Sequence, residues 1–119
     1  MYFLLIVPAD YGLFPDRDTS ERLAGIPGLY NCSETTIGDR FSASFDYQGD
    51  STIVRLSEDH QRLSVAGSGP ASTRLAVLVA QALASLSLRL FDLDYSFDIP
   101  LDTGTSEQAL RDQLEAIPQ

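Results

Sequence analysis

The sequence predicts an α+β fold in two layers, with a mostly antiparallel sheet and helices packed on one of its faces. Residues 36–66 read as short strands separated by polar turns, with apolar and polar residues alternating in Phe41–Tyr47, and two later segments carry apolar residues at helical spacing. Alternation places one face of a strand on a core and the other in water. Short strands joined by polar turns favour hairpins over a parallel sheet, and helices on one face complete the two layers.

The first strand is expected at Tyr2–Val7, a continuous apolar run that Pro8 ends. A run without alternation is typical of a strand buried on both faces, so this strand should be an interior one. A short helix follows. Asp18 can cap it, Glu21 completes a capping-box spacing, and Gly25 stops it.

Three strands of a β-meander are then expected at residues 41–47, 52–56 and 62–66, separated by polar turns. A long helix should start at Pro70, because a proline needs no hydrogen-bond partner at the first helical position. A last helix is expected after Thr105, which can cap it together with Gln108. The apolar stripes of these two helices are Leu75, Leu78, Val79, Ala82, Leu83 and Leu86 in the first, and Ala109, Leu110, Leu114 and Ile117 in the second.

Between these helices, the alternation in residues 95–102 predicts a strand, and residues 88–91 predict the start of one. Pro100 cannot donate to a ladder, so this should be an edge strand. If the strand is continuous, its acids project from one face and its apolar residues from the other. The acids are Asp92, Asp94, Asp98 and Asp102, and the apolar residues are Tyr95, Phe97, Ile99 and Leu101.

Length and composition predict one domain, residues 1–119. The 13.0 kDa chain is 44% hydrophobic, enough for a core that needs neither metal nor disulfide. A single cysteine excludes an internal disulfide. The sequence has no signal-peptide pattern and no run of about twenty apolar residues, so we expect a cytoplasmic protein.

The charge is strongly negative and unevenly distributed. The net charge is −9, of which residues 90–119 contribute −6, with seven acids and one arginine. Phosphate backbones and anionic membranes repel such a chain, so we expect neither nucleic acid nor membrane as a partner. An acidic surface can instead speed the encounter with a basic protein, although it can also simply keep a protein soluble.

No constellation of catalytic or metal-ligating residues is apparent, so we expect no enzyme, no cofactor and no metal site. His60 is the one histidine and lies in a predicted turn, where a solvated ring is expected, and Cys32 is expected to be at least half-buried. The Asp92–Asp98 spacing is similar to a calcium loop, but Phe97 stands where that loop needs glycine. Gly67–Pro70 precedes a helix without the lysine of a phosphate-binding loop, so a structural turn is expected there.

The C-terminal half resembles small acidic bacterial proteins that include immunity proteins of polymorphic toxin systems. The resemblance is one of layout. It consists of Val65–Gly69, an Ala/Leu-rich helix to Leu86, and the run Leu90–Asp98. It implies a cytoplasmic inhibitor that occludes a cognate toxin, with acidic residues against a basic cleft, and it implies no specific functional residue.

The leading hypothesis is therefore a protein-binding immunity protein whose partner is a basic toxin domain. The expected interface is Asp92, Asp94, Asp98, Asp102 and Tyr95. Exposed aromatic anchors would add to it, with Tyr11, Phe14, Tyr30 and Tyr47 as candidates. The alternative is a small-molecule-binding or regulatory domain with a pocket between sheet and helices, and an unrecognised enzyme ranks third. The sequence carries no signal of oligomeric state.

Overall fold

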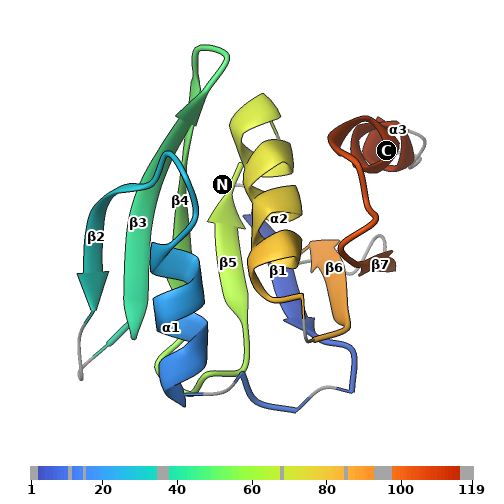
Figure 1. Ribbon diagram of the computed structural model, residues 1–119. Helices are drawn as coiled ribbons and strands as arrows, with labels where there is room; N and C mark the ends of the chain where they lie inside the picture. The colour runs from blue at the N-terminus through green and yellow to red at the C-terminus, as the bar shows by residue number, and fades with distance from the viewer. Residues whose placement is uncertain are drawn as a thin grey trace.

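In the computed structural model, the described residues form an α+β fold in which three helices cover one face of a seven-stranded sheet (Figure 1). The structure describes residues 3–10, 12–14, 16–34, 38–67, 69–84, 86–92 and 98–115. The elements in chain order are β1 (Phe3–Pro8), α1 (Asp16–Ala24), β2 (Tyr30–Glu34), β3 (Phe41–Tyr47), β4 (Asp50–Leu56), β5 (Leu63–Ala66), α2 (Pro70–Ala82), β6 (Leu88–Asp92), β7 (Asp98–Leu101) and α3 (Glu107–Glu115). The predicted fold class is confirmed.

Each pair of neighbouring strands in the sheet is antiparallel, in the order β2-β3-β4-β5-β1-β6-β7. The first strand of the chain therefore lies between β5 and β6, with Leu4, Leu5, Ile6 and Val7 all buried. This confirms the interior position that its unbroken apolar run predicts. The meander β3-β4-β5 and the edge position of β7 are confirmed as well.

The main core lies between the sheet and the helices. Leu23 of α1, Leu75 of α2 and Leu110 of α3 are each fully buried in the same cluster as Leu4 and Ile6 of β1. Burial of a leucine side chain contributes about 1.5–3 kcal/mol, so this layer stabilises the helices more than their own propensity does. Most positions of α2 are buried, because α2 contacts both other helices as well as the sheet.

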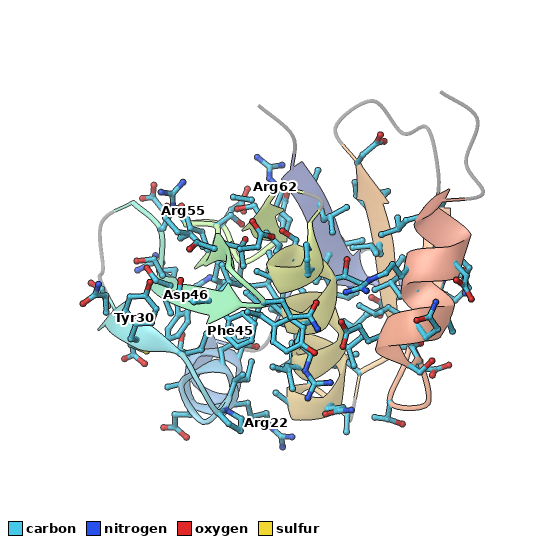
Figure 2. All side chains as sticks on the ribbon, turned by 90° about the horizontal axis from the view of Figure 1, so that it is seen from above. Arg22, Tyr30, Phe45, Asp46, Arg55 and Arg62 are labelled. Carbon is cyan, nitrogen blue, oxygen red and sulfur yellow. The ribbon has the colours of Figure 1, made fainter. Side chains whose placement is uncertain are left out.

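The opposite side of the sheet, here called the open face, carries none of the helices formed by the described residues (Figure 2). Alternation along β1 and β6 directs Leu5, Val7 and Phe91 to this side, where they form a second, small apolar cluster. On β3, β4 and β5 the open-face positions include four serines and Asp46, with Ile53 and Arg55 exposed.

Three local expectations are corrected. β2 was not expected, because its five exposed residues lack an apolar alternation and a register shift interrupts its pairing with β3. Helix α1 begins at Asp16, so Asp18 lies within the helix and not at the position before it. Helix α3 is capped by Ser106, whose hydroxyl accepts the Ala109 N–H at 3.0 Å.

The predicted stripe of α3 is partly correct. Leu110 is fully buried and Leu114 packs against the core at its margin, but Ala109 is exposed. Ile117 lies outside the described residues. None of the helices built from the described residues is both long enough and apolar enough to span a membrane.

Candidate functional site

The predicted acidic strand is in fact a hairpin. β6 and β7 are separate antiparallel strands, and Phe91 lies opposite Asp98 in their register. Residues opposite each other in a ladder share a face, so Asp92, the neighbour of Phe91, points to the other face from Asp98. The expectation that the acids project from one face of a continuous strand is therefore wrong, because the chain reverses direction between them.

Asp92 does not belong to the surface. It is only 5% exposed and shares the helix side of the sheet with Leu90, next to Leu4 of β1. A side chain this buried is not available to a docking partner, so Asp92 does not contribute to an exposed acidic patch. Asp94 and Tyr95, the other predicted interface residues of this segment, lie outside the described residues.

Asp98 is exposed on the open face, where the Arg89 guanidinium compensates its charge. Arg89 Nε donates to Asp98 Oδ1 at 2.8 Å, and Arg89 Nη2 donates to Oδ2 at 2.9 Å. A bidentate pair of this kind fixes the geometry of both groups. Because both side chains are more than a third exposed, the pair contributes at most about 1 kcal/mol to stability.

Asp102 is exposed at the end of β7 and organises the turn into α3. Its Oδ1 accepts the Gly104 N–H at 2.8 Å and the Thr105 hydroxyl at 3.3 Å, while the Asp102 N–H donates to the Thr105 hydroxyl. Thr105, expected to cap the last helix, therefore belongs to this turn. Because Asp102 is exposed, its carboxylate also contributes negative charge to the surface.

The candidate aromatic anchors differ in how exposed their side chains are. Phe14 is buried in the core, Tyr47 is half-buried, and Tyr30 is 43% exposed on β2. The Tyr30 hydroxyl donates to Asp46 Oδ1 at 2.8 Å, and this hydrogen bond is the main cause that raises the pKa of Tyr30 above its usual value. Tyr30 and Asp46 lie far from the β6–β7 hairpin, at the opposite edge of the sheet (Figure 2). Tyr11 lies outside the described residues.

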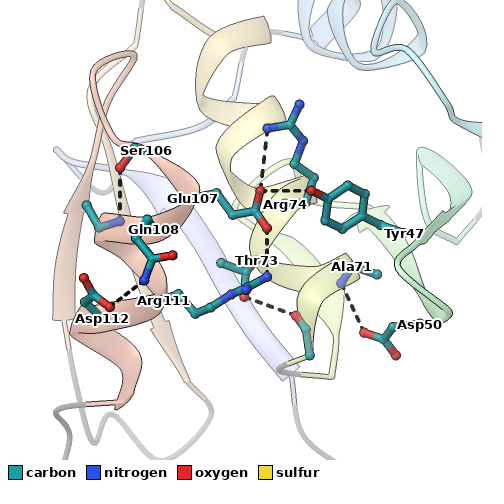
Figure 3. A network of polar contacts seen from close by, with 12 residues as sticks. Tyr47, Asp50, Ala71, Thr73, Arg74, Ser106, Glu107, Gln108, Arg111 and Asp112 are labelled. Carbon is teal, nitrogen blue, oxygen red and sulfur yellow. Dashed lines mark hydrogen bonds and ion pairs between the residues drawn. The ribbon is translucent and has the colours of Figure 1, made fainter.

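A polar network attaches α3 to the body of the fold (Figure 3). Glu107 accepts from Arg111 Nη2 at 2.8 Å, lies 3.7 Å from Arg74 Nη1, and is contacted by the Tyr47 hydroxyl at 3.4 Å. The Arg74 guanidinium also lies over the Tyr47 ring, 5.7 Å from its centroid. The Glu107–Arg111 spacing is readable from the sequence as an i,i+4 pair, but the contacts with α2 and β3 are not.

The N-terminus of α2 is occupied by a carboxylate from another part of the chain, that of Asp50. Asp50, at the β3–β4 turn, accepts the Ala71 N–H at 3.1 Å, so a residue from a distant hairpin caps the helix (Figure 3). A negative group is favourable there because the free N–H groups and the helix dipole both attract it. A Cβ on Gly69 would collide with the Asp50 carboxylate, so the glycine is required for this contact. The turn before Pro70 is therefore structural, as predicted, and the carboxylate of Asp50 lies against the helix start that follows it.

Cys32 and His60 differ from expectation. Cys32 is exposed on the edge strand β2, and His60 has a buried Nε2 although it lies in the expected turn. His60 adopts a left-handed backbone with φ of 58°, and its carbonyl accepts the Phe14 N–H. The described residues contain no group of three or more histidine, cysteine, aspartate or glutamate side chains placed to hold a metal ion.

Comparisons with protein-family models, with curated proteins and with solved structures found no match to this chain.

Proposed function

We propose that this chain is a protein-binding module, an immunity protein that binds and inhibits a basic bacterial toxin domain. The proposed contact surface is the acidic end, defined by β7, α3 and the turn between them, with Asp98, Asp102 and Asp112 as its exposed acids. The observation that carries the proposal is charge. Residues 90–119 hold −6 of the net −9. Asp98, Asp102 and Asp112 are exposed there, and Arg89 offsets the charge of Asp98.

The fold gives this end the access that a docking surface needs. β7 is the last strand of the sheet, and Pro100 in it is exposed. On α3, the buried side carries Leu110, which leaves Asp112 on the outward side. Excess negative charge on such an end attracts a basic surface over a distance of about 8 Å at physiological ionic strength, and it raises the rate of association more than the final affinity.

The first experiment identifies the partner and tests the inhibition. Tagged protein captures its partner from the native host, and the captured protein is then expressed alone and together with this chain. We expect a basic partner that arrests growth when alone and is harmless when co-expressed. A captured partner without toxicity, or toxicity that this chain does not relieve, would contradict the immunity function.

A second experiment tests the surface with matched charge changes. The triple variant Asp98→Asn, Asp102→Asn and Asp112→Asn removes three charges and keeps an acceptor oxygen at each position. The control Glu21→Gln, Glu34→Gln and Glu58→Gln removes three exposed charges elsewhere. We expect the first variant to slow association about tenfold at low salt and to lose most salt dependence, with a smaller effect of the control. Equal rates for both variants would exclude the acidic end as the docking surface.

A further inference from the structure

Exposed apolar side chains gather at one place on the open face. Among the described residues, the large apolar side chains that are exposed are Leu13, Tyr30 and Ile53. Tyr30 of β2 lies in register with Ser44 of β3, and Ser44 lies in register with Ile53 of β4. Residues opposite each other in a ladder share a face of the sheet, and both neighbours of Ser44 along β3 are buried in the main core. Tyr30, Ser44 and Ile53 therefore form one row on the open face.

The middle of this row is low, because the side chain of Ser44 is much smaller than those on either side of it. Neighbouring strands lie about 4.8 Å apart, so the backbones of Tyr30 and Ile53 are separated by roughly 10 Å. Tyr30 is 43% exposed and Ile53 is 37% exposed, so each presents part of its apolar side chain to water. A side chain of another molecule can therefore lie over Ser44, between the Tyr30 ring and Ile53.

An exposed carboxylate lies next to this row. Asp46 stands two residues beyond Ser44 on the same face of β3, and Figure 2 shows it close to Tyr30 at the β2 edge of the sheet. The Tyr30 hydroxyl donates to Asp46 Oδ1 at 2.8 Å, and within the described part of the chain no arginine pairs with this carboxylate. A hydroxyl is a neutral donor, so Asp46 keeps its negative charge. The row and this acid, here called the open-face patch, are Tyr30, Ser44, Asp46 and Ile53.

An aromatic ring, a carboxylate and an apolar neighbour together suit a guanidinium group. A guanidinium is planar and weakly hydrated, so it stacks on a tyrosine ring while its N–H groups bond a carboxylate. A carboxylate accepts about four hydrogen bonds, and the Tyr30 hydroxyl uses one of those of Asp46. A lysine ammonium is more strongly hydrated and has no planar face to stack. Tyrosine and arginine are also enriched among the residues that contribute most to the affinity of protein interfaces.

We propose that the open-face patch docks a segment of a protein partner that presents an arginine beside an apolar side chain. The arginine lies on the Tyr30 ring and pairs with Asp46, and the apolar side chain lies over Ser44 against Ile53. The net charge of −9 favours such a cationic segment over an acidic segment or a nucleic acid.

This inference does not rest on the proposed immunity function. The open-face patch lies on β2, β3 and β4, at the edge of the sheet opposite to β7 and the acidic end. Variants of one surface therefore leave the other surface intact, and failure of one proposal is distinguishable from failure of the other.

The test is an NMR titration of the isotope-labelled protein with a short peptide that alternates arginine and leucine. Changes in the amide shifts locate the bound peptide and give its Kd. We expect the largest changes at Tyr30, Ser44, Asp46 and Ile53, and a Kd about fivefold weaker when lysine replaces arginine in the peptide. The triple asparagine variant of the acidic end should retain the shift changes at the open-face patch.

Matched variants separate the patch from general charge and hydrophobicity. Asp46→Asn removes the charge and keeps an acceptor for Tyr30, whereas Glu21→Gln removes a charge from an exposed position of α1. Ile53→Thr removes an exposed apolar group and stays β-branched, and Leu13→Thr makes a similar change outside the patch. We expect Asp46→Asn and Ile53→Thr each to weaken peptide binding about fivefold, and either control to weaken it less than about twofold.

Three results would overturn the proposal. Shift changes without a maximum at the open-face patch, or equal losses in Asp46→Asn and Glu21→Gln, would mean that general charge attraction binds the peptide. Equal affinity for the lysine peptide would exclude recognition of a guanidinium. A dimer of the unliganded protein in light scattering, lost in Ile53→Thr, would assign the patch to a second copy of this chain instead.

Discussion

At the residue scale, several acids of this chain hold backbone groups in place in addition to charging the surface. Asp102 organises the turn before α3, Asp50 of the β3–β4 hairpin caps α2, and Asp59 organises the β4–β5 turn. A carboxylate suits each position because it accepts N–H or O–H donors that a turn or helix start leaves unpaired. These acids therefore stabilise turns and a helix start in addition to contributing negative charge.

Asp59 gives the pH dependence that belongs to this scale. The Ser57 hydroxyl donates to Asp59 Oδ1 at 2.6 Å and the Gln61 N–H donates to the same oxygen at 3.1 Å. These bonds, the hydroxyl first, lower the pKa of Asp59 below its usual value. Since the folded pKa lies below the unfolded one, the contribution to stability is present above the unfolded pKa of about 3.9 and is lost as the pH falls through the folded pKa.

We expect Ser57→Ala to raise the pKa of Asp59 toward its ordinary value, because the strongest donor to the carboxylate is removed. A carboxyl carbon NMR titration measures this directly. Ser51→Ala, at an exposed serine of β4, is the control and should leave the pKa of Asp59 unchanged. A pKa of Asp59 that is the same in Ser57→Ala and in the wild-type protein would contradict the assignment.

At the scale of elements, α3 is attached by one apolar and one polar anchor whose magnitudes differ. Leu110 is fully buried in the main core, whereas Glu107 contacts arginines whose side chains are 33% and 40% exposed. Deleting a buried leucine side chain leaves a cavity and costs about 2–5 kcal/mol. Exposed ion pairs contribute about 0.2–1 kcal/mol, because water screens them.

Leu110→Ala should therefore lower the free energy of unfolding by about 2–5 kcal/mol, and Glu107→Gln by about 1 kcal/mol or less. Urea unfolding followed by circular dichroism measures both. Leu114→Ala, at a half-buried position of the same helix, should fall between them. A larger cost for Glu107→Gln than for Leu110→Ala would show that the polar network, and not the core, holds the helix.

Elements with a strong pattern could be predicted from the sequence. The apolar run of β1, the alternation of β3 and Pro70 at the start of α2 placed each element within a few residues. β2 was not predicted because all five of its residues are exposed, so its sequence has no alternation of apolar and polar residues that would indicate a strand. The cap of α3 was misplaced because neighbouring residues, Thr105 and Ser106, both have capping side chains, and the fold selects Ser106.

At the scale of the whole molecule, the main core joins all three helices to the sheet. Leu23, Leu75 and Leu110 belong to one cluster with residues of β1, β3, β4, β5, β6 and β7. A shared core of this kind couples the elements, because detaching any one helix from the sheet would expose apolar side chains of the others to water.

We therefore expect one cooperative unfolding transition, as predicted for a single domain. Far-UV circular dichroism reports the helices and strands, and the fluorescence of the five tyrosines, in a chain without tryptophan, reports tertiary contacts. The two urea transitions should coincide. Separate midpoints would indicate that the chain contains more than one folding unit.

The sequence by itself determined the α+β class, the interior position of the first strand, the meander and the edge strand at Pro100. Each follows from a local pattern of side chains along one segment. The tertiary structure decided which residues share a surface. Reversal of the chain between β6 and β7 sends Asp92 into the interior and Asp98 to the open face, and the pairing of β4 with β3 and β5 places Arg55 between Ser42 and Ser64. Such neighbours come from distant segments, and only strand order and register bring them together.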